Sequence, residues 1–372
     1  MWYAQQLAPG KPGYNVSEYL EIHGDLDVDL FVAALRRTLD EAETLRLRFR
    51  VTGGEPWQYI DDSDDHPIEV IDVSAAADPR AAAEKLMRSG LRHPVDLAEG
   101  PMVSYMVFRL GDDRFIWHMR AHHLVLDGHS TWVIASRVSQ IYTALREGRA
   151  PEAGALRPLS ELIAADLAYQ DSPDYSRDQA YWLDALSDLP ESDEPDKQQL
   201  RRLPETRERH TEDLGPVDAA GLNEAARRLD INPAKLMIAA ALYQHRVTGA
   251  RDVVIGVPVR GARAYWGIPR NTSNVLPTRL RIDQRTTVGE LAEQASRTIG
   301  EALRHQHYRY EDILRDLKLL DGGALFSLVV NVMPFDCSMR VGDCTAHARN
   351  LSSGPIDNVR IDIYDRLAGT GI

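Results

Sequence analysis

The stretch HMRAHHLVLDGHS (118–130) holds four of the twelve histidines of a 372-residue chain. It begins inside RFIWHMRA (114–121), an alternating segment whose period of two predicts a β-strand. It runs into a helical pattern that starts near Ser130 and ends at Gly148. The sequence therefore predicts a strand, a tight turn and a helix, with two adjacent histidines at the carboxyl end of the strand.

The rest of the chain also reads as alternating strands and helices. EYLEIHG (18–24) has the pattern of a strand, and Asp27 is placed to cap the amphipathic helix that follows. In the second half, DVVIGVPV (252–259), NVLPTRLRI (274–282) and LFSLVVNVMP (325–334) read as strands separated by helices. These patterns predict the α/β class in both halves.

The length of the chain favours two lobes of similar size. The pattern loosens over a charged, proline-punctuated region that begins at about residue 149, so we place the boundary near residue 165. The predicted lobes are 1–165, which carries the histidine pair, and 166–372.

Composition excludes several classes of function. The formal net charge of −13 argues against a surface for nucleic acid or an anionic membrane. No apolar run reaches the length of about 20 residues that a membrane span needs, and the N-terminus lacks a signal-peptide pattern. The two cysteines, Cys337 and Cys344, share one polar loop, so no disulfide framework is implied. We expect a cytoplasmic protein.

Three interpretations of the histidine cluster compete. Strand-end histidines can simply make hydrogen bonds in a core. Three of them, His118, His122 and His123, could supply imidazoles to zinc, but a spacing of four on a strand does not bring two side chains together. The third interpretation is acid–base catalysis, because a neutral imidazole can hold or accept a proton at cellular pH.

The acid–base interpretation fits the residues that follow the pair. Gly128 would let the backbone turn sharply after Asp127 into the helix, whose first N–H groups could stabilise a developing oxyanion. The carboxylate of Asp127 would need a cationic partner if it is buried.

The segment HHLVLDG (122–128) matches the His-His-x-x-x-Asp-Gly signature of the condensation domains of nonribosomal peptide synthetases, within the chloramphenicol-acetyltransferase-like superfamily. Other sequence blocks resemble those of the same family and occur in the same order. These blocks are WYAQQLAPGKPGYNVSEYLEIHGDLD (2–27), ETLRLRFR (43–50), QAYWLDAL (179–186), IGVPVRGAR (255–263), NVLPTRL (274–280), RHQHYRYEDIL (304–314) and LFSLVVNVMPF (325–335). The sequences TLRLRF (44–49), EPWQ (55–58) and GPIDN (354–358) are most similar to those of siderophore synthetases.

The resemblance implies two chloramphenicol-acetyltransferase-like α/β sandwich lobes in a V-shaped pseudo-dimer with a central tunnel. It implies an acyltransferase-type enzyme that joins an upstream acyl or peptidyl thioester to the α-amine of a downstream aminoacyl thioester. Both substrates would arrive on the phosphopantetheine arms of donor and acceptor peptidyl carrier proteins, so the domain needs no cofactor of its own. The implied protein is one monomeric domain of a synthetase that also holds an adenylation domain, and the chain ends look incomplete.

The resemblance also implies roles for the motif. His123 matches the active-site position, where it would position the amine, take up its proton or stabilise the tetrahedral intermediate, and Gly128 would place a backbone N–H beside it. His122 is expected to be structural, since adjacent strand residues point to opposite faces. We expect His118 and His129 to be wall or surface residues.

Asp127 is expected to pair with an arginine of the loop that follows residue 259. Arg263 and Arg260 both qualify, with a slight preference for Arg263. Ser130 is expected to be the helix cap rather than a catalyst.

A further set of residues would line the substrate tunnel. Asn331 and the SSGPIDN loop (352–358), with Ser353 and Gly354, are expected across the tunnel from His123. The loop that is expected to form the floor of the tunnel would contribute two aromatic side chains, Tyr265 and Trp266.

Two other functions remain open at this point. An epimerisation domain shares the fold and the histidine motif, but it uses a different continuation of the motif and a glutamate as partner base. A catalytically silent recruitment domain has the same fold, but it typically loses the histidine pair or the glycine, both of which this chain keeps.

Overall fold

The computed structural model describes the chain except for residues 7–9, 64–65, 155, 190–207, 213–214, 229–233, 262–266, 320–324, 334–337, 355–358 and 365–372. The chain divides into two units. Unit 1 comprises Met1–Asp166, Arg263–Thr272 and Asp336–Pro355, and unit 2 comprises Leu167–Ala262, Ser273–Phe335 and Ile356–Ile372. Two short segments from the second half of the sequence thus belong to the unit that holds the histidine motif.

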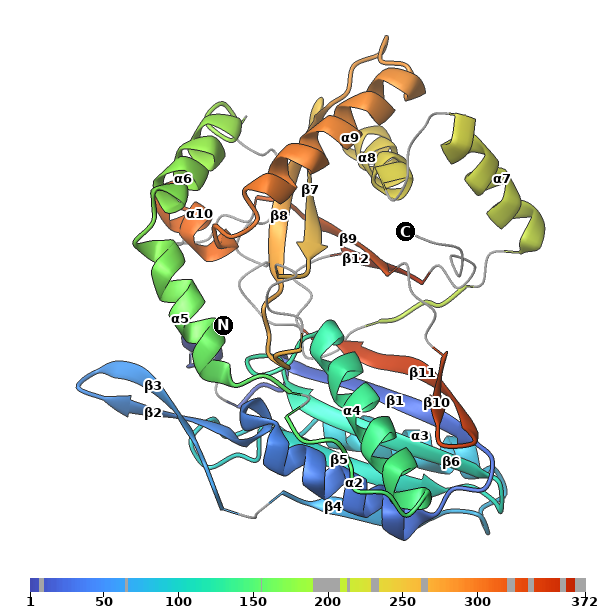
Figure 1. Cartoon of the computed structure of the whole chain (residues 1–372). Coiled ribbons are helices and arrows are strands. Elements are labelled where there is room, and N and C mark those ends of the chain that lie inside the picture. The colour runs from blue at the N-terminus through green and yellow to red at the C-terminus, as the bar shows by residue number, and fades with distance from the viewer. Residues whose placement is uncertain are drawn as a thin grey trace. The chain divides into compact units, whose positions relative to one another are not determined.

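Unit 1 is built on a six-stranded sheet with the order β10-β11-β1-β6-β5-β4 (Figure 1). Its neighbouring strands are antiparallel except for the parallel pair β4 and β5. The strands are β1 (Asn15–His23), β4 (Ile68–Asp72), β5 (Val103–Arg109), β6 (Arg114–His122), β10 (Ser338–Val341) and β11 (Cys344–Ser353), and β2 (Leu47–Thr52) and β3 (Glu55–Ile60) form a separate hairpin.

Helices cover both faces of this sheet. Helices α2 and α4 lie together on one face and α3 lies on the other (Figure 1). Asp27 caps α2, as the sequence predicted, by accepting a hydrogen bond from the backbone N–H of Leu30. The helices are α1 (Trp2–Gln6), α2 (Val28–Glu41), the 3-10 helix η1 (Glu43–Arg46), α3 (Pro79–Leu91), α4 (Gly128–Arg146) and α5 (Leu159–Gln170), which crosses the boundary between the units.

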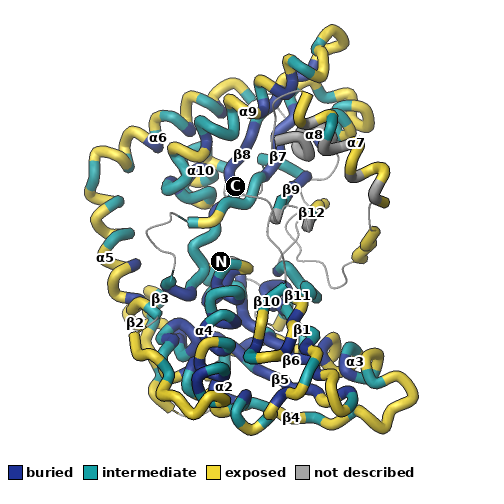
Figure 2. Tube along the Cα trace, turned by 45° about the vertical axis from the view of Figure 1, so that its right-hand side comes forward, coloured by how far each residue is buried: buried dark blue, intermediate teal, exposed yellow. Residues whose placement is uncertain are grey.

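The alternation of β6 sorts its side chains between the two faces. Trp117 and Met119 pack with α2 and α4, and the Trp117 ring lies 5.5 Å from that of Phe31. His118 is buried on the opposite face, where Arg120 donates to the carbonyl of Gly90 in α3. Figure 2 shows β1, β5 and β6 as the buried centre of the unit. This rigid strand leads directly into the histidine pair.

Unit 2 has a four-stranded sheet with the order β12-β9-β7-β8. The capping box of Thr287 and Glu290 starts α9, a long helix between β8 and α10. The elements are α6 (Pro173–Ala185), α7 (Pro216–Arg228), α8 (Ala234–Thr248), β7 (Asp252–Val259), β8 (Asn274–Arg281), α9 (Val288–Arg304), α10 (Tyr310–Asp316), β9 (Leu328–Met333) and β12 (Val359–Tyr364). The α/β class predicted for both halves of the sequence is confirmed.

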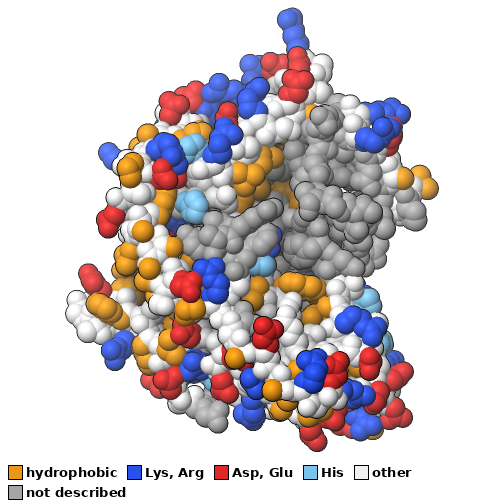
Figure 3. Space-filling view, viewed as in Figure 1, with side chains coloured by type: hydrophobic (Ala, Val, Ile, Leu, Met, Phe, Trp, Pro, Cys, Tyr) orange, Lys and Arg blue, Asp and Glu red, His pale blue; other side chains and the backbone are white. Residues whose placement is uncertain are grey.

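The surface carries charges of both signs, which are interspersed over the face shown in Figure 3. Within the described part of the chain, no helix is long and apolar enough to cross a membrane. Cys344 is a buried thiol, whereas Cys337 lies outside the described residues.

Candidate active site

The second histidine of the motif lies just beyond the end of β6. The backbone N–H of His123 donates to the carbonyl of Tyr14 at 2.8 Å. Its ring nitrogen Nδ1 lies 2.8 Å from the carbonyl oxygen of Leu126. A carbonyl oxygen can only accept, so Nδ1 must carry the proton and the lone pair of the neutral ring is on Nε2. The turn thereby sets the tautomer in which Nε2 is a base.

The carboxyl end of β11 packs closely against this ring. A Cβ atom added to Gly354 would lie 2.6 Å from His123 Cδ2 and 3.2 Å from Val16 Cγ1. The φ angle of Gly354 is +85°, in the region that favours glycine. Two of the predicted site residues, His123 and Gly354, are therefore brought into contact.

Asp127 caps α4. Its Oδ1 accepts from the backbone N–H of Ser130 at 2.8 Å, and its Oδ2 accepts from the backbone N–H of Thr272 at 2.9 Å. The expectation that Ser130 is the cap is wrong, because Ser130 is already inside the helix and its hydroxyl lies 2.7 Å from Asp127. The aspartate joins the start of α4 to the segment before β8.

The expected arginine partner of Asp127 stays a prediction. Arg263 lies outside the described residues, and Arg260 is exposed. The contacts that the structure gives the Asp127 carboxylate come from backbone N–H groups and a hydroxyl.

Residues 270–272 form a support that the sequence did not reveal. The Asn271 side chain donates to the carbonyl of His123 at 2.7 Å, and its backbone N–H donates to the carbonyl of Val125 at 3.0 Å. The hydroxyl of Ser130 lies 2.6 Å from the carbonyl of Arg270. These hydrogen bonds span more than 100 positions in sequence, and no local pattern signals them. They hold the histidine turn from outside.

His122 belongs to the scaffold of unit 1. It is 1% exposed, its Nδ1 accepts from the backbone N–H of Leu124 at 3.1 Å, and its Nε2 donates to Gln5 Oε1 at 3.2 Å. His118 is completely buried against Ser17, so its expected place on a wall or surface is wrong. In the described residues, no group of three or more metal-ligating side chains comes together.

Burial keeps these two imidazoles neutral. Desolvation lowers the pKa of His118 and of His122 to about 3. Each folded pKa lies below the unfolded value of about 6.5, so the unfolded chain binds more protons as the pH falls below that value. When the pH falls from 7 to 5, each histidine should therefore lower the free energy of unfolding by about 2 kcal/mol. Urea unfolding at both pH values checks this, and His118→Asn should show a smaller loss than the wild type.

Removal of the Asp127 charge should destabilise the protein. The two carboxylate oxygens of Asp127 accept hydrogen bonds from Ser130 and Thr272. In Asp127→Asn, only one oxygen remains as an acceptor, and the new NH₂ group would face a hydrogen-bond donor. We expect a loss of about 1–3 kcal/mol in the free energy of unfolding, measured by urea titration. An unchanged stability with activity lost would instead give Asp127 a direct part in catalysis.

Three other predicted site residues, Gly128, Asn331 and Ser353, lie among the residues that the structure describes. Gly128 is exposed, does not adopt a positive φ, and an added Cβ would meet nothing within 4 Å, so the turn does not require glycine there. Asn331 donates to Asp362 Oδ1 at 2.8 Å within unit 2. Ser353 donates to Asn350 Oδ1 at 3.1 Å. Tyr265 and Trp266 lie outside the described residues.

Unit 1 presents a histidine just beyond the end of a central strand of its sheet, with Nδ1 held by a backbone carbonyl. This arrangement is suited to acid–base chemistry at Nε2. A family model for the condensation domain matches residues 1–359. The chain belongs to the condensation domain family of nonribosomal peptide synthetases, whose members catalyse amide bond formation.

Similar proteins agree with this family. The chain is 39% identical to a dimodular nonribosomal peptide synthase of Bacillus subtilis, covering 100% of the chain and 16% of that protein. It is 28% identical to enterobactin synthase component F of Escherichia coli, covering 99% of the chain and 29% of that protein. The starter condensation domain of rhizomide synthetase, in complex with C8-CoA, is 34% identical, with a TM-score of 0.88 over 98% of this chain and 83% of that one. The chain thus spans under a third of the curated relatives.

Proposed function

We propose that this domain condenses a donor acyl or peptidyl thioester with the α-amine of an acceptor aminoacyl thioester, in the assembly of a nonribosomal peptide. The observation that carries the proposal is the hydrogen bond from His123 Nδ1 to the carbonyl of Leu126, because it directs the basic lone pair to Nε2. The similarity to a starter condensation domain that binds an acyl-CoA supports an acyl thioester as the donor.

In the proposed reaction, the acceptor nitrogen attacks the thioester carbonyl carbon and a new C–N bond forms. His123 Nε2 positions the amine and accepts its proton, and the C–S bond then breaks to release the donor thiol, which takes up a proton. A thioester is already activated, so much of the acceleration comes from positioning the two reactants. The reaction needs no metal, oxidant or covalent acyl-enzyme.

Carrier proteins supply both substrates in this proposal. Upstream and downstream peptidyl carrier proteins would present them on phosphopantetheine arms, and an adenylation domain of the same synthetase would select the acceptor amino acid. The domain would act as a monomer without a cofactor of its own. The enterobactin synthase relative supports a siderophore as the product class.

The test is a single-turnover assay with two loaded carrier proteins, followed by intact-protein mass spectrometry. Transfer of the donor acyl group onto the acceptor carrier, with a mass that equals the amide, supports the proposal. Inversion of an α-carbon without transfer would favour epimerisation, and binding of carriers without either reaction would favour a recruitment domain.

Gly128 provides a test of how the acceptor reaches His123. It is exposed, and an added Cβ there would meet nothing within 4 Å, so a leucine can be accommodated. In the proposal, this leucine would narrow the approach of the acceptor to His123. We expect Gly128→Leu to fold normally and bind the donor carrier, yet to lower product formation with a carrier-bound acceptor by at least about tenfold. A small soluble amine at high concentration should be less affected, and equal loss with both acceptors would contradict this prediction.

A further inference from the structure

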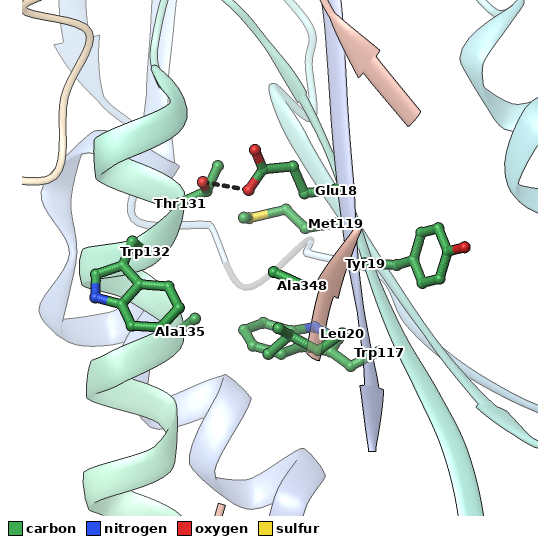
Figure 4. Close-up of a pocket in the computed structure, with 9 residues that line it drawn as sticks. All are labelled: Glu18, Tyr19, Leu20, Trp117, Met119, Thr131, Trp132, Ala135 and Ala348. Carbon is green, nitrogen blue, oxygen red and sulfur yellow. Dashed lines mark hydrogen bonds between the residues drawn. The ribbon is translucent and has the colours of Figure 1, made fainter. Parts of the chain in front are cut away.

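Glu18 is a carboxyl group near the histidine turn that the proposed reaction does not use. It belongs to β1, is partly buried, and points towards α4, whereas the next residue, Tyr19, points to the other side of the sheet (Figure 4). Val16, which packs beside Gly354 at the His123 ring, precedes Glu18 by two residues. Two residues of a strand span about 6.6 Å and return to the same face. Glu18 is therefore a neighbour of the site on the same face of the sheet.

The carboxyl of Glu18 is linked on one side to the start of α4. Its Oε2 lies 2.6 Å from the hydroxyl oxygen of Thr131, and this hydroxyl oxygen lies 2.8 Å from the carbonyl oxygen of Gly128 (Figure 4). Gly128 is the first residue of α4 and follows Asp127, whose carboxylate accepts from the segment that supports the histidine turn. Through Thr131, Glu18 thus holds the beginning of the helix that follows the turn.

On its other side, the carboxyl is linked to the end of β11. An irregularity in the pairing of β1 with β11 places Asn350 opposite Glu18. Glu18 Oε1 lies 3.5 Å from the amide nitrogen of Asn350, and Asn350 Oδ1 accepts from the hydroxyl of Ser353 at 3.1 Å. Ser353 precedes Gly354, which packs against the His123 ring. Glu18 therefore connects two structures that both bear on His123.

The hydrogen atoms available decide which form of the carboxyl fits these contacts. A threonine hydroxyl has one hydrogen to donate, and a carbonyl oxygen has none. If Glu18 were ionised, the one hydrogen of Thr131 would have to serve both Glu18 Oε2 and the Gly128 carbonyl. If Glu18 is protonated, Oε2 donates to Thr131, Thr131 donates to Gly128, and Oε1 accepts from Asn350. The neutral acid is the form that satisfies all three contacts.

The cations of the neighbouring strands lie on the other face of the sheet. Arg349 of β11 pairs in register with Tyr19, which points away from α4 (Figure 4). Arg120 of β6 donates to the carbonyl of Gly90 in α3, on the face opposite α4. Neither arginine is placed to neutralise an ionised Glu18.

The titratable groups on the α4 side also favour the acid. Asp127, at the start of α4, is a like charge, and His123 lies beyond the end of β6 with Nδ1 turned to the Leu126 carbonyl. His129 is two residues before Thr131, which is a rotation of about 200° around the helix. Burial raises the pKa of the Glu18 carboxyl, and the charge of Asp127 acts in the same direction.

We infer that Glu18 is a positioning residue for His123, and that its carboxyl acts as a neutral acid joining the start of α4 to the end of β11 through Thr131 and Asn350. The inference rests on the proposed function, because the group that is positioned is the base of amide formation. Ionisation would remove the hydrogen that Oε2 donates and would place a second negative charge near Asp127.

Two substitutions separate the polar role of Glu18 from its volume. In Glu18→Gln, the NH₂ group can donate to Thr131 and the oxygen can accept from Asn350, so amide formation between two loaded carriers should stay within about twofold of the wild type. Glu18→Leu fills a similar volume without polar atoms and should lower the rate at least about tenfold. Equal losses in the two variants, or a wild-type rate in Glu18→Leu, overturn the inference.

Infrared spectra of the whole chain report the protonation state of Glu18 directly. The difference between the wild type and Glu18→Gln at neutral pH should contain the C=O stretch of a protonated carboxyl. The matched control is Glu21→Gln, because Glu21 belongs to the same strand but forms an ion pair with Arg80 at 2.6 Å. Its difference spectrum should contain the bands of an ionised carboxylate. Carboxylate bands for Glu18 as well would contradict the neutral acid, and this measurement does not require Glu18→Leu to fold.

The pH profile links this protonation state to the rate. Glutamine does not ionise, so the ratio of the wild-type rate to the Glu18→Gln rate cancels the titration of the amine substrate. The acid form is present below the folded pKa of Glu18 and is lost above it. The ratio should therefore fall with rising pH wherever the acid band disappears, and it should stay constant where the band persists. A constant ratio while the band disappears would show that the proton has no part in positioning.

A last pair of measurements tests the route and separates the two proposals. Thr131→Val combined with Glu18→Leu should lose no more activity than the more damaged single variant, and losses that multiply count against action through Thr131. Without any substrate, spectra of ¹⁵N-labelled histidine should change for His123 in Glu18→Leu and not in Glu18→Gln. If the spectra respond in this way but no amide forms, the positioning role stands and the proposed function fails.

Discussion

Replacement of His123 by alanine should lower amide formation between two loaded carrier proteins by at least about 100-fold. The ring is held with Nε2 as the basic nitrogen by the bond from Nδ1 to the Leu126 carbonyl, and alanine removes the group that positions and deprotonates the amine. The residual rate should exceed zero, because an activated thioester and an amine brought together still react. Intact-protein mass spectrometry of the acceptor carrier gives the rate.

The control for this substitution is His93→Ala. His93 is an exposed histidine of the same unit, so its loss tests whether removal of any imidazole slows the reaction. Its activity should match the wild type, and the His123→Ala protein should keep its melting temperature. A wild-type rate in His123→Ala would remove His123 from the proposed mechanism.

The pattern around the motif predicted the local structure well, because it is set by short-range periodicity. The alternation of 114–121 gave the strand, and its continuation separates buried His122 from His123, which lies at the turn. The same argument failed for His118. Its face of the strand is covered by α3, and the sequence around residue 118 carries no sign of what packs there.

The supports of the site could not be predicted in this way. Asn271 and Thr272 reach the turn from about 150 residues away in sequence. Each donates a backbone N–H, which every residue type except proline possesses, and Asn271 adds its side-chain amide. Ser130 was expected to cap α4 because serine favours that position, yet Asp127, three residues earlier, takes it. The helix begins at Gly128, two residues before the apolar pattern that predicted it.

Gly354 packs closely against the His123 ring. Substitution of this glycine is expected to have the second large effect on the rate of amide formation. In Gly354→Ala, the new Cβ would lie 2.6 Å from His123 Cδ2, which is too short for two non-bonded carbon atoms. Either the ring or the end of β11 must move. A displacement of about 1 Å in a catalytic group can cost about 100-fold in rate, so we expect a loss of that order in amide formation.

The φ angle of +85° at Gly354 adds backbone strain, and this contribution must be separated from the displacement of the ring. Gly148→Ala is the matched control: Gly148 has a φ of +67° in the same unit, but an added Cβ there would meet nothing within 4 Å. Both variants should lose stability through the backbone strain, with a further loss from the close contact in Gly354→Ala, while only Gly354→Ala should lose activity. Spectra of ¹⁵N-labelled histidine report the tautomer of His123, and they should change only in Gly354→Ala. Equal activity in the two variants would show that Gly354 does not position the ring. Backbone strain alone would then account for the effect of Gly354→Ala, with no displacement of His123.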